Sequence, residues 1–246
     1  MLNRQKIIIL AASLIAASLI LYAVHYLMFQ DLRHILIYGL DELAFLPIEV
    51  LLVTLVIDRL LEASEKRAMM NKLNMVIGAF FSEVGTEFMS KVFRLDAEFE
   101  KNRHRFIVRP DWTSRTFDAT RQSIPGYEYQ ISVAGPDLPE LKEFLVDKRE
   151  FLLRLLENPN LLEHEEFSEV LWSVFHLTEE LDARENVMTL SEADYAHIAA
   201  DTKRAYVAVL GAWVDYMQHL KKAYPYLFAM AVRTNPFDPD AKAEIS

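Results

Sequence analysis

The sequence predicts an all-α protein in which a two-helix transmembrane hairpin is followed by a cytoplasmic helical bundle domain. Three observations predict this class. The 246 residues include only six Gly and nine Pro, which favours helix because both residues are poor helix formers. Two strongly apolar runs lie within the first 61 residues. Beyond them, apolar residues recur at three-to-four-residue intervals, the spacing of one helix face.

The first apolar run, residues 7–29, contains no charged side chain. At a helical rise of about 1.5 Å per residue it is long enough to cross a hydrocarbon core of roughly 30 Å. Arg4 and Lys6 precede it, and aromatic residues gather at its far end, as in an interfacial belt. A cleaved signal peptide is the alternative, although the run is long for that role and no clear small-residue cleavage motif follows it.

The second run, residues 43–61, is weaker because Pro47 and Glu49 interrupt it. It reaches the length of a span only if Asp58 and Arg59 lie among the lipid headgroups. Lys and Arg are enriched before the first span and after the second, whereas the connection between them is acidic. We therefore expect a multi-pass protein of the cell (inner) membrane, in contact with the lipid bilayer, with both termini cytoplasmic.

Two features of the predicted hairpin have functional and purely structural interpretations. A small-residue face allows close helix approach, either to the neighbouring span or in a homo-oligomer; its residues are Ala12, Ser13, Ala16 and Ala17. Glu49 and His25 are polar groups within the predicted spans. Such groups indicate a functional pathway by default, but here they would also fit a simple link between the two helices.

The predicted cytoplasmic domain covers residues 62–234, and its apolar periodicity is interrupted by an irregular basic segment at 102–134. Ser191 and Asp194 form a capping-box-like start for the longest helix of the domain. Residues 235–246 are rich in Pro and Asp, and we expect a disordered tail there. Helices are predicted at 60–100, 116–123, 139–157, 167–181, 192–224 and 227–232.

The irregular segment is the basic part of an acidic chain. Its arginines would suit an anion such as a lipid headgroup or a nucleotide. Pairing with the acidic segment at 163–185 is the alternative, and it is favoured because no Gly-rich phosphate loop accompanies the arginines. The arginines are Arg103, Arg105, Arg109, Arg115 and Arg121.

Two helix sides combine His with carboxylates and are weak candidates for a metal site. A helical-bundle metal centre would need Glu-x2-His pairs on facing helices, and the chain has none. The polar stripe also flanks the apolar face of its helix, so a solvated helix side is the favoured interpretation. The candidates are His176, Glu180, Asp194, His197 and Asp201.

Other chemistries find little support. The chain has no Cys, so it lacks thiolate nucleophiles and Cys-ligated metal centres. Its net charge of −10 makes nucleic acid an unfavourable partner. Phosphate-binding and nucleophile–base signatures are absent from the sequence, so we predict no catalytic residues and no cofactor. We do not expect an enzyme, although a triad assembled from distant residues would leave no such signature.

In its order of parts, the chain resembles uncharacterised prokaryotic membrane proteins with two N-terminal spans and a helical cytosolic domain; no named family is indicated. The leading hypothesis is an interaction or regulatory module at the cytoplasmic face of the membrane, with an unknown protein partner. One alternative is a small oligomeric channel or transport subunit that uses Glu49. A second is a metal-dependent helical enzyme built on His176, His197 and His219.

Overall fold

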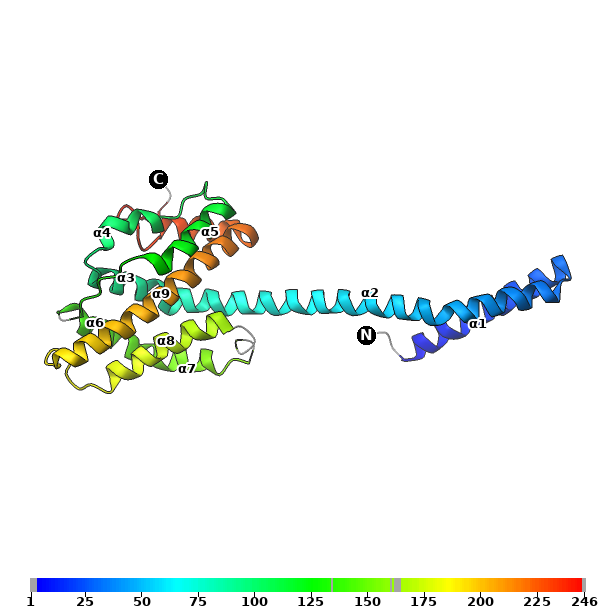
Figure 1. Ribbon diagram of the computed structural model, residues 1–246, viewed down its shortest axis with the longest axis horizontal. Helices are drawn as coiled ribbons and strands as arrows, with labels where there is room; N and C mark the ends of the chain where they lie inside the picture. Colours follow the sequence, from blue (N-terminus) through cyan, green and yellow to red (C-terminus); the bar gives the residue numbers. More distant parts are fainter. Residues whose placement is uncertain (1–3, 134, 160, 162–164, 245–246) are drawn as a thin grey trace. The chain divides into compact units, whose positions relative to one another are not determined.

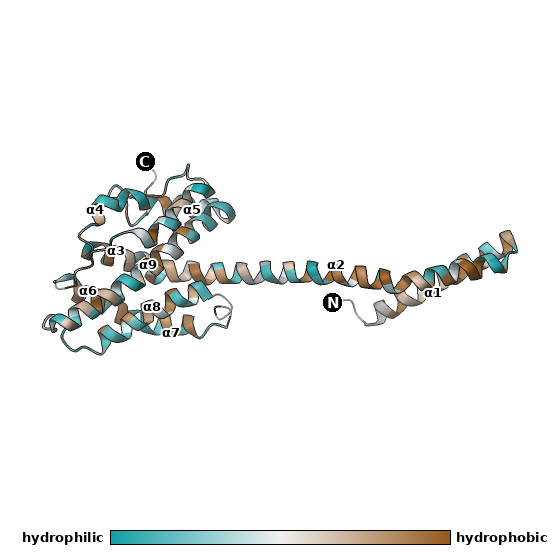
Figure 2. Ribbon diagram, viewed as in Figure 1, coloured by the Kyte–Doolittle hydropathy of each residue, from teal (hydrophilic) through white to brown (hydrophobic). Residues whose placement is uncertain are grey.

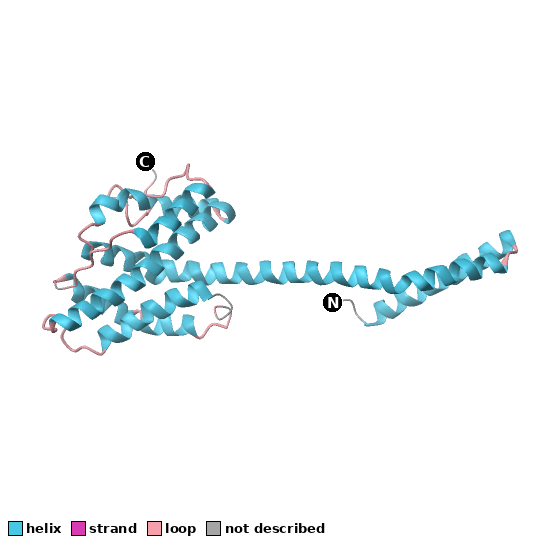
Figure 3. Ribbon diagram, viewed as in Figure 1, coloured by secondary structure: helices cyan, strands magenta, loops and turns pink. Residues whose placement is uncertain are grey.

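The computed structural model describes the backbone at residues 4–133, 135–159, 161 and 165–244. The described residues confirm the all-α class, since their regular elements are helices joined by loops (Figure 3). An isolated antiparallel bridge joins Asp96 to Ile131. The chain divides into two compact units, Met1–Lys66 and Arg67–Ser246, and each is described separately.

The first unit holds α1 (Arg4–Phe29) and the first part of α2 (Leu32–Phe80). Gln30 makes the turn between them with a positive φ of 48°. Asp31 then precedes α2, and its carboxylate accepts a hydrogen bond from the His34 amide at 3.0 Å. The side chains of Arg4 and Lys6, on which the predicted topology partly depends, lie outside the residues described.

One described helix has the length and hydropathy of a membrane span, at Ile8–Phe29. The predicted second span, residues 43–61, lies inside α2, which continues through Pro47. This part of α2 does not meet the same criterion among the residues described. The transmembrane hairpin therefore remains a prediction, although its two segments are helical.

The second unit is built around α9 (Glu192–Ala223), which lies beside α8 (Glu165–Asp182) in Figure 1. Ser191 caps α9 as predicted, because its hydroxyl accepts a hydrogen bond from the Asp194 amide at 3.1 Å. Helices α3, α5 and α10 also contact α9. The remaining elements are η1 (Phe81–Gly85), α3 (Thr86–Val92), η2 (Phe93–Leu95), α4 (Phe99–Asn102), η3 (Arg103–Phe106), α5 (Ser114–Ser123), η4 (Ile124–Gly126), α6 (Asp137–Asp147), α7 (Arg149–Leu156) and α10 (Pro225–Arg233).

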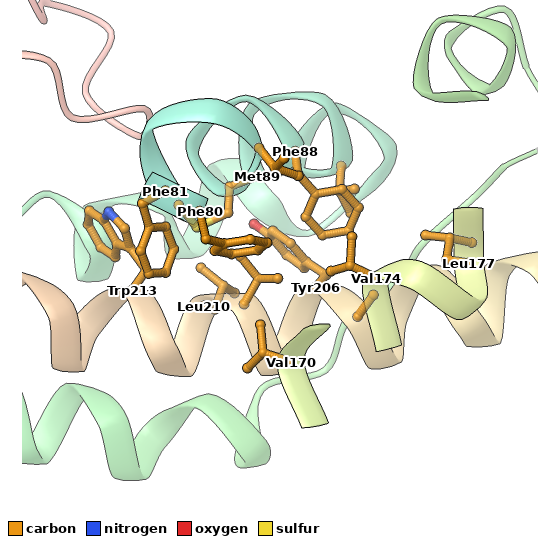
Figure 4. Close-up of a cluster of buried hydrophobic side chains, with 14 of the residues drawn as sticks. Phe80, Phe81, Phe88, Met89, Val170, Val174, Leu177, Tyr206, Leu210 and Trp213 are labelled. Carbon is orange, nitrogen blue, oxygen red and sulfur yellow. The ribbon is translucent and has the colours of Figure 1, made fainter. Parts of the chain in front are cut away.

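The core of this unit forms where the end of α2, η1 and α3 meet α8 and α9 (Figure 4). Phe80 and Phe88 are fully buried there, and Tyr206 is almost fully buried. Phe80 also packs edge-on against Phe167 of α8, with ring centroids 5.5 Å apart. Burial of such large side chains supplies the main favourable term in folding.

Gly85 ends a π-helical turn, η1, that interrupts the helical run between α2 and α3. A Cβ at Gly85 would lie 2.5 Å from Cδ1 of Phe81 and 2.8 Å from Cε1 of Phe80. The rings of both phenylalanines are buried. The π-turn therefore depends on a residue without a side chain, since the rings occupy the space that a methyl group would need.

We predict that Gly85→Ala lowers the stability of the second unit by about 1–3 kcal/mol, because the added methyl group overpacks the core. Thermal unfolding followed by Trp fluorescence measures this, since all three Trp residues lie in this unit. Gly126→Ala is the matched control, because nothing lies within 4 Å of the position that its methyl group would take. An equal melting temperature for Gly85→Ala and wild type would contradict the prediction.

The first residues of the expected disordered tail are buried instead. Asn235 donates a hydrogen bond from Nδ2 to the Phe106 carbonyl at 3.0 Å, and its Oδ1 accepts one from the Phe237 amide at 2.8 Å. The Phe237 ring lies 5.2 Å from that of Trp213 and 5.4 Å from that of Phe106. The composition of the tail did not reveal this, because Asn235 and Phe237 are held by contacts with other segments.

We predict that Phe237→Ala destabilises the second unit by about 3 kcal/mol or more, since it removes a buried aromatic ring. The change should also alter the emission of Trp213, which contacts that ring. Substitution of exposed Lys242 by Ala should leave both melting temperature and emission unchanged. If Phe237→Ala matched this control, the tail would not be part of the core.

Candidate functional site

The candidate site lies between α8 and α9, which pack antiparallel. His176 and Glu180 are one helical turn apart on α8, and His197 and Asp201 are one turn apart on α9. His176 faces Asp201 while Glu180 faces His197, so the two pairs run in opposite directions. Residues four apart share a helix face, and this register brings four polar side chains together.

The donor atoms of this cluster are close to one another. The Nε2 atoms of His176 and His197 each lie 3.3 Å from Oδ2 of Asp201. His197 Nε2 is also 3.5 Å from Glu180 Oε2, and His176 Nε2 is 4.0 Å from Glu180 Oε1. Ligand atoms of Glu180, His197 and Asp201 all lie within 4.8 Å of one another, a group that does not include His176.

Asp201 lies at the buried end of the cluster, with 2% of its surface exposed. Its Oδ1 is 3.1 Å from Nη2 of Arg204. Its Oδ2 is inaccessible and accepts no hydrogen bond from the described residues. The expectation of a solvated helix side is therefore wrong for Asp201, because α8 covers this side of α9.

Arg184 holds the outer end of the cluster. Its Nη1 lies 2.7 Å from Glu180 Oε2, and its Nη2 lies 3.3 Å from Asp194 Oδ1. The hydrogen bond from Arg184 lowers the pKa of Glu180. The hydrogen bond from Ser191, followed by that from Arg184, lowers the pKa of Asp194. Both carboxylates are thus ionised at neutral pH. Asp194 interacts with the capping residue Ser191 and with Arg184.

A cavity of about 870 Å³ adjoins this cluster. The end of α2, α8, α9 and the segment around η4 line it, and Arg204 connects it to Asp201. Its wall contains charges of both signs together with aromatic rings. The polar lining includes Arg121, Tyr127, Glu166, Lys203, Asp215 and His219.

Arg121 lies in this cavity wall and pairs with Asp215, with Nε 3.1 Å from Oδ2. A Cβ at Gly211 would lie 2.7 Å from Cζ of Arg121, so Gly211 makes room for the guanidinium on α9. Burial raises the pKa of Asp215, and Arg121 opposes this shift. A charged Arg121 therefore helps to keep Asp215 ionised.

The predicted arginine cluster does not form one anion site. Arg103 pairs with Glu100 at 3.3 Å, and Arg121 pairs with Asp215. Arg105, Arg109 and Arg115 are exposed. Among the described residues, the acidic segment at 165–185 forms its arginine ion pairs with Arg149 and Arg184. The predicted pairing between these two segments is thus not the arrangement found in the described part of the chain.

The polar residues predicted within the spans belong to the first unit. Glu49 is exposed on α2. The His25 ring lies 4.9 Å from Phe29 and 5.8 Å from His34. Tyr22, at the same end of α1, is 3.5 Å from Glu42. The exposed small-residue face of α1 keeps its interpretation as a helix-packing surface, and its role stays a prediction.

The sequence pointed to the four central residues of the cluster only as weak candidates, and it gave no sign of Arg204 or the cavity. The expected signature of a metal site was a set of Glu-x2-His pairs. The signal present is a different one, a His-x3-Glu pair on one helix and a His-x3-Asp pair on the next. Two such pairs converge when antiparallel helices pack with those faces together.

Two family models match the chain. One, described as the C-terminal helical domain of uncharacterized protein MJ1433, matches residues 69–233. The other, the MJ1433 N-terminal helical domain, matches residues 2–61. Uncharacterized protein MJ1433 of Methanocaldococcus jannaschii is 41% identical over 236 residues, which cover 96% of this chain and 95% of the relative. The chain belongs to the MJ1433 family.

No solved structure matches the chain. Membership of the MJ1433 family confirms the resemblance inferred from the sequence, to an uncharacterised group with helical N- and C-terminal domains and without a named function. It assigns no residue a role. The chemistry of the site therefore follows from its own geometry.

We predict that His219 makes this MJ1433-family protein sensitive to acid. Burial, aided by Lys222, lowers the pKa of His219. Below about pH 6.5, His219 therefore binds a proton more readily in the unfolded chain than in the folded state. The free energy of unfolding consequently falls as the pH drops through that value. His219→Gln should lose less stability than wild type between about pH 7.5 and 5.5, measured as urea midpoints by Trp fluorescence. Equal losses would contradict this role.

Proposed function

We propose that the protein is a membrane-anchored binding module, with α1 and the first part of α2 as the anchor and residues 67–246 as a regulatory domain at the cytoplasmic face. The observation that carries this proposal is the uncovered apolar surface of the first unit. The cavity of the second unit supports the binding part of the proposal.

Large apolar side chains are exposed throughout both helices of the first unit. Leu27 is 74% exposed on α1, and Leu51 is 58% exposed on α2. Figure 2 shows hydrophobic residues along α1 and along the adjoining part of α2. Soluble monomers rarely expose a continuous apolar surface of this extent, and a lipid bilayer would cover it.

The distribution of basic residues supports an orientation with both termini in the cytoplasm. Arg4 and Lys6 precede α1, and Arg59, Lys66 and Arg67 follow the apolar part of α2. Between residues 7 and 58 the sequence contains one Arg, at position 33, and no Lys, whereas Asp31, Asp41 and Glu42 lie close to that position. Loops rich in Lys and Arg stay on the cytoplasmic side.

The cavity gives the domain a place for a ligand. Its volume of about 870 Å³ lies within the range of about 300–1,000 Å³ that is usual for small-molecule sites. Aromatic and aliphatic surface from Tyr127, Ile77 and Val170 lies beside the charged groups of Lys203 and Glu166. This lining suits an amphipathic small molecule that carries a polar or charged group.

We predict the topology with single cysteines, because the natural chain has none. A membrane-impermeant maleimide should label Arg33→Cys in intact cells, since this residue lies at the start of α2 between the proposed spans. It should label Lys242→Cys only after the cells are lysed. The protein should also remain in the membrane pellet after alkaline carbonate extraction.

The two positions are matched controls, because both are exposed in the structure and differ in the proposed side of the membrane. Labelling of Lys242→Cys in intact cells would overturn the cytoplasmic placement of the domain. Labelling of Arg33→Cys only after lysis would overturn the hairpin, because the connection between the two segments would then lie in the cytoplasm. Release of the protein by carbonate would overturn the anchor itself.

A further inference from the structure

We propose that His176, Glu180, His197 and Asp201 form a binding site for one divalent transition-metal ion between α8 and α9. This site is independent of the membrane anchor and of the ligand of the cavity. Three features support it: the geometry of the donor atoms, the burial of Asp201 and the chemistry of the donor set.

Three separations between donor atoms match those of a tetrahedral site. Metal–ligand distances of about 2.0–2.2 Å place neighbouring ligand atoms of a tetrahedron roughly 3.3–3.6 Å apart. Both imidazole Nε2 atoms lie 3.3 Å from Asp201 Oδ2, and His197 Nε2 lies 3.5 Å from Glu180 Oε2. His176 Nε2 lies 4.0 Å from the other oxygen of Glu180, Oε1, so binding by all four residues requires a side-chain movement of His176 or Glu180.

The second observation is the unsatisfied oxygen of Asp201. Only 2% of the surface of this residue is exposed, and Oδ2 accepts no hydrogen bond among the described residues. Burying an anionic oxygen without a hydrogen bond is costly. This oxygen points at the two imidazoles, where a cation bound to all three groups would satisfy it.

The groups around the cluster fix its ligands. Arg204 holds Oδ1 of Asp201 and leaves Oδ2 free to face the histidines. Arg184 binds Oε2 of Glu180, the oxygen that faces His197, and Oε1 is the oxygen nearer His176. Such outer contacts orient metal ligands and raise the selectivity of their geometry.

The donor set identifies the class of ion. Two imidazoles disfavour Mg²⁺ and Ca²⁺, which prefer oxygen ligands throughout. Imidazole with carboxylate suits Zn²⁺, Fe²⁺ or Mn²⁺, and the tetrahedral spacing favours Zn²⁺ among them. The chain contains no thiolate that would favour a softer ion.

An ion-pair network is the competing explanation. In that case a protonated His176 or His197 would neutralise Asp201, and the cluster would need no metal. The two explanations differ in their need for an ion, because an ion-pair network has no requirement for a bound metal. Metal binding at about pH 7.5 therefore separates them.

The test uses the full chain in mild detergent, stripped with EDTA and titrated with Zn²⁺ at about pH 7.5 against a chromophoric chelator. We expect one ion per chain. His197→Ala, which changes a half-exposed residue, should weaken binding at least about tenfold, since even an outer-shell change costs about 10–100-fold. Asp201→Asn should weaken it at least as much. His104→Ala is the matched control, an exposed histidine of the same unit outside the cluster.

A second measurement separates loss of binding from loss of folding. Zn²⁺ should raise the melting temperature of wild type and of His104→Ala, because the ion binds the native state. It should leave that of His197→Ala unchanged while the metal-free melting temperatures stay similar. Wild-type protein that binds no Zn²⁺, or His197→Ala that binds as tightly as wild type, would overturn the site.

Discussion

The antiparallel packing of α8 on α9 is the contact on which the rest of the second unit depends. The same register places two kinds of surface together. Val174 and Leu177 of α8 are fully buried in the core that contains Leu210 of α9 (Figure 4). One helix side away, His176 meets Asp201 and Glu180 meets His197. If α8 slid along α9 by one helical turn, both the apolar contacts and the polar contacts would be lost. The packing of the apolar core therefore also fixes the positions of the polar side chains.

Asp201 imposes an energetic constraint on this packing. A buried carboxylate destabilises a fold unless it is paired and hydrogen-bonded. Arg204 pairs with Oδ1, while Oδ2 faces the imidazoles of His176 and His197 without a hydrogen bond among the described residues. The neighbouring Thr202 hydroxyl is also buried without a hydrogen-bond partner among those residues. A core built for stability alone would favour an apolar residue at position 201, and functional sites are where such local conflicts are expected.

Periodicity and capping predicted the helices well because each depends on a short stretch of one helix. The apolar stripe of α9 and its Ser191 cap are examples. The π-turn at Phe81–Gly85 was not predictable, since it follows from the fit of two phenylalanine rings around Gly85. The burial of Asp201 and Phe237 depends on neighbours that come from other segments. The sequence therefore indicated which residues could form a site, but not that they lie together between two helices.

The two units use similar apolar residues under opposite constraints. In the second unit, Leu73 and Phe80 of α2 are buried in the core to which α8 and α9 contribute. Earlier on the same helix, Leu51 and Val53 are more than half exposed. Apolar burial contributes about 25 cal/mol per Å², so such a surface is costly in water and needs a cover that the described chain does not supply. A bilayer would supply that cover without specific contacts, so the proposed anchor rests on composition and exposure alone, whereas the proposed metal site requires atomic distances.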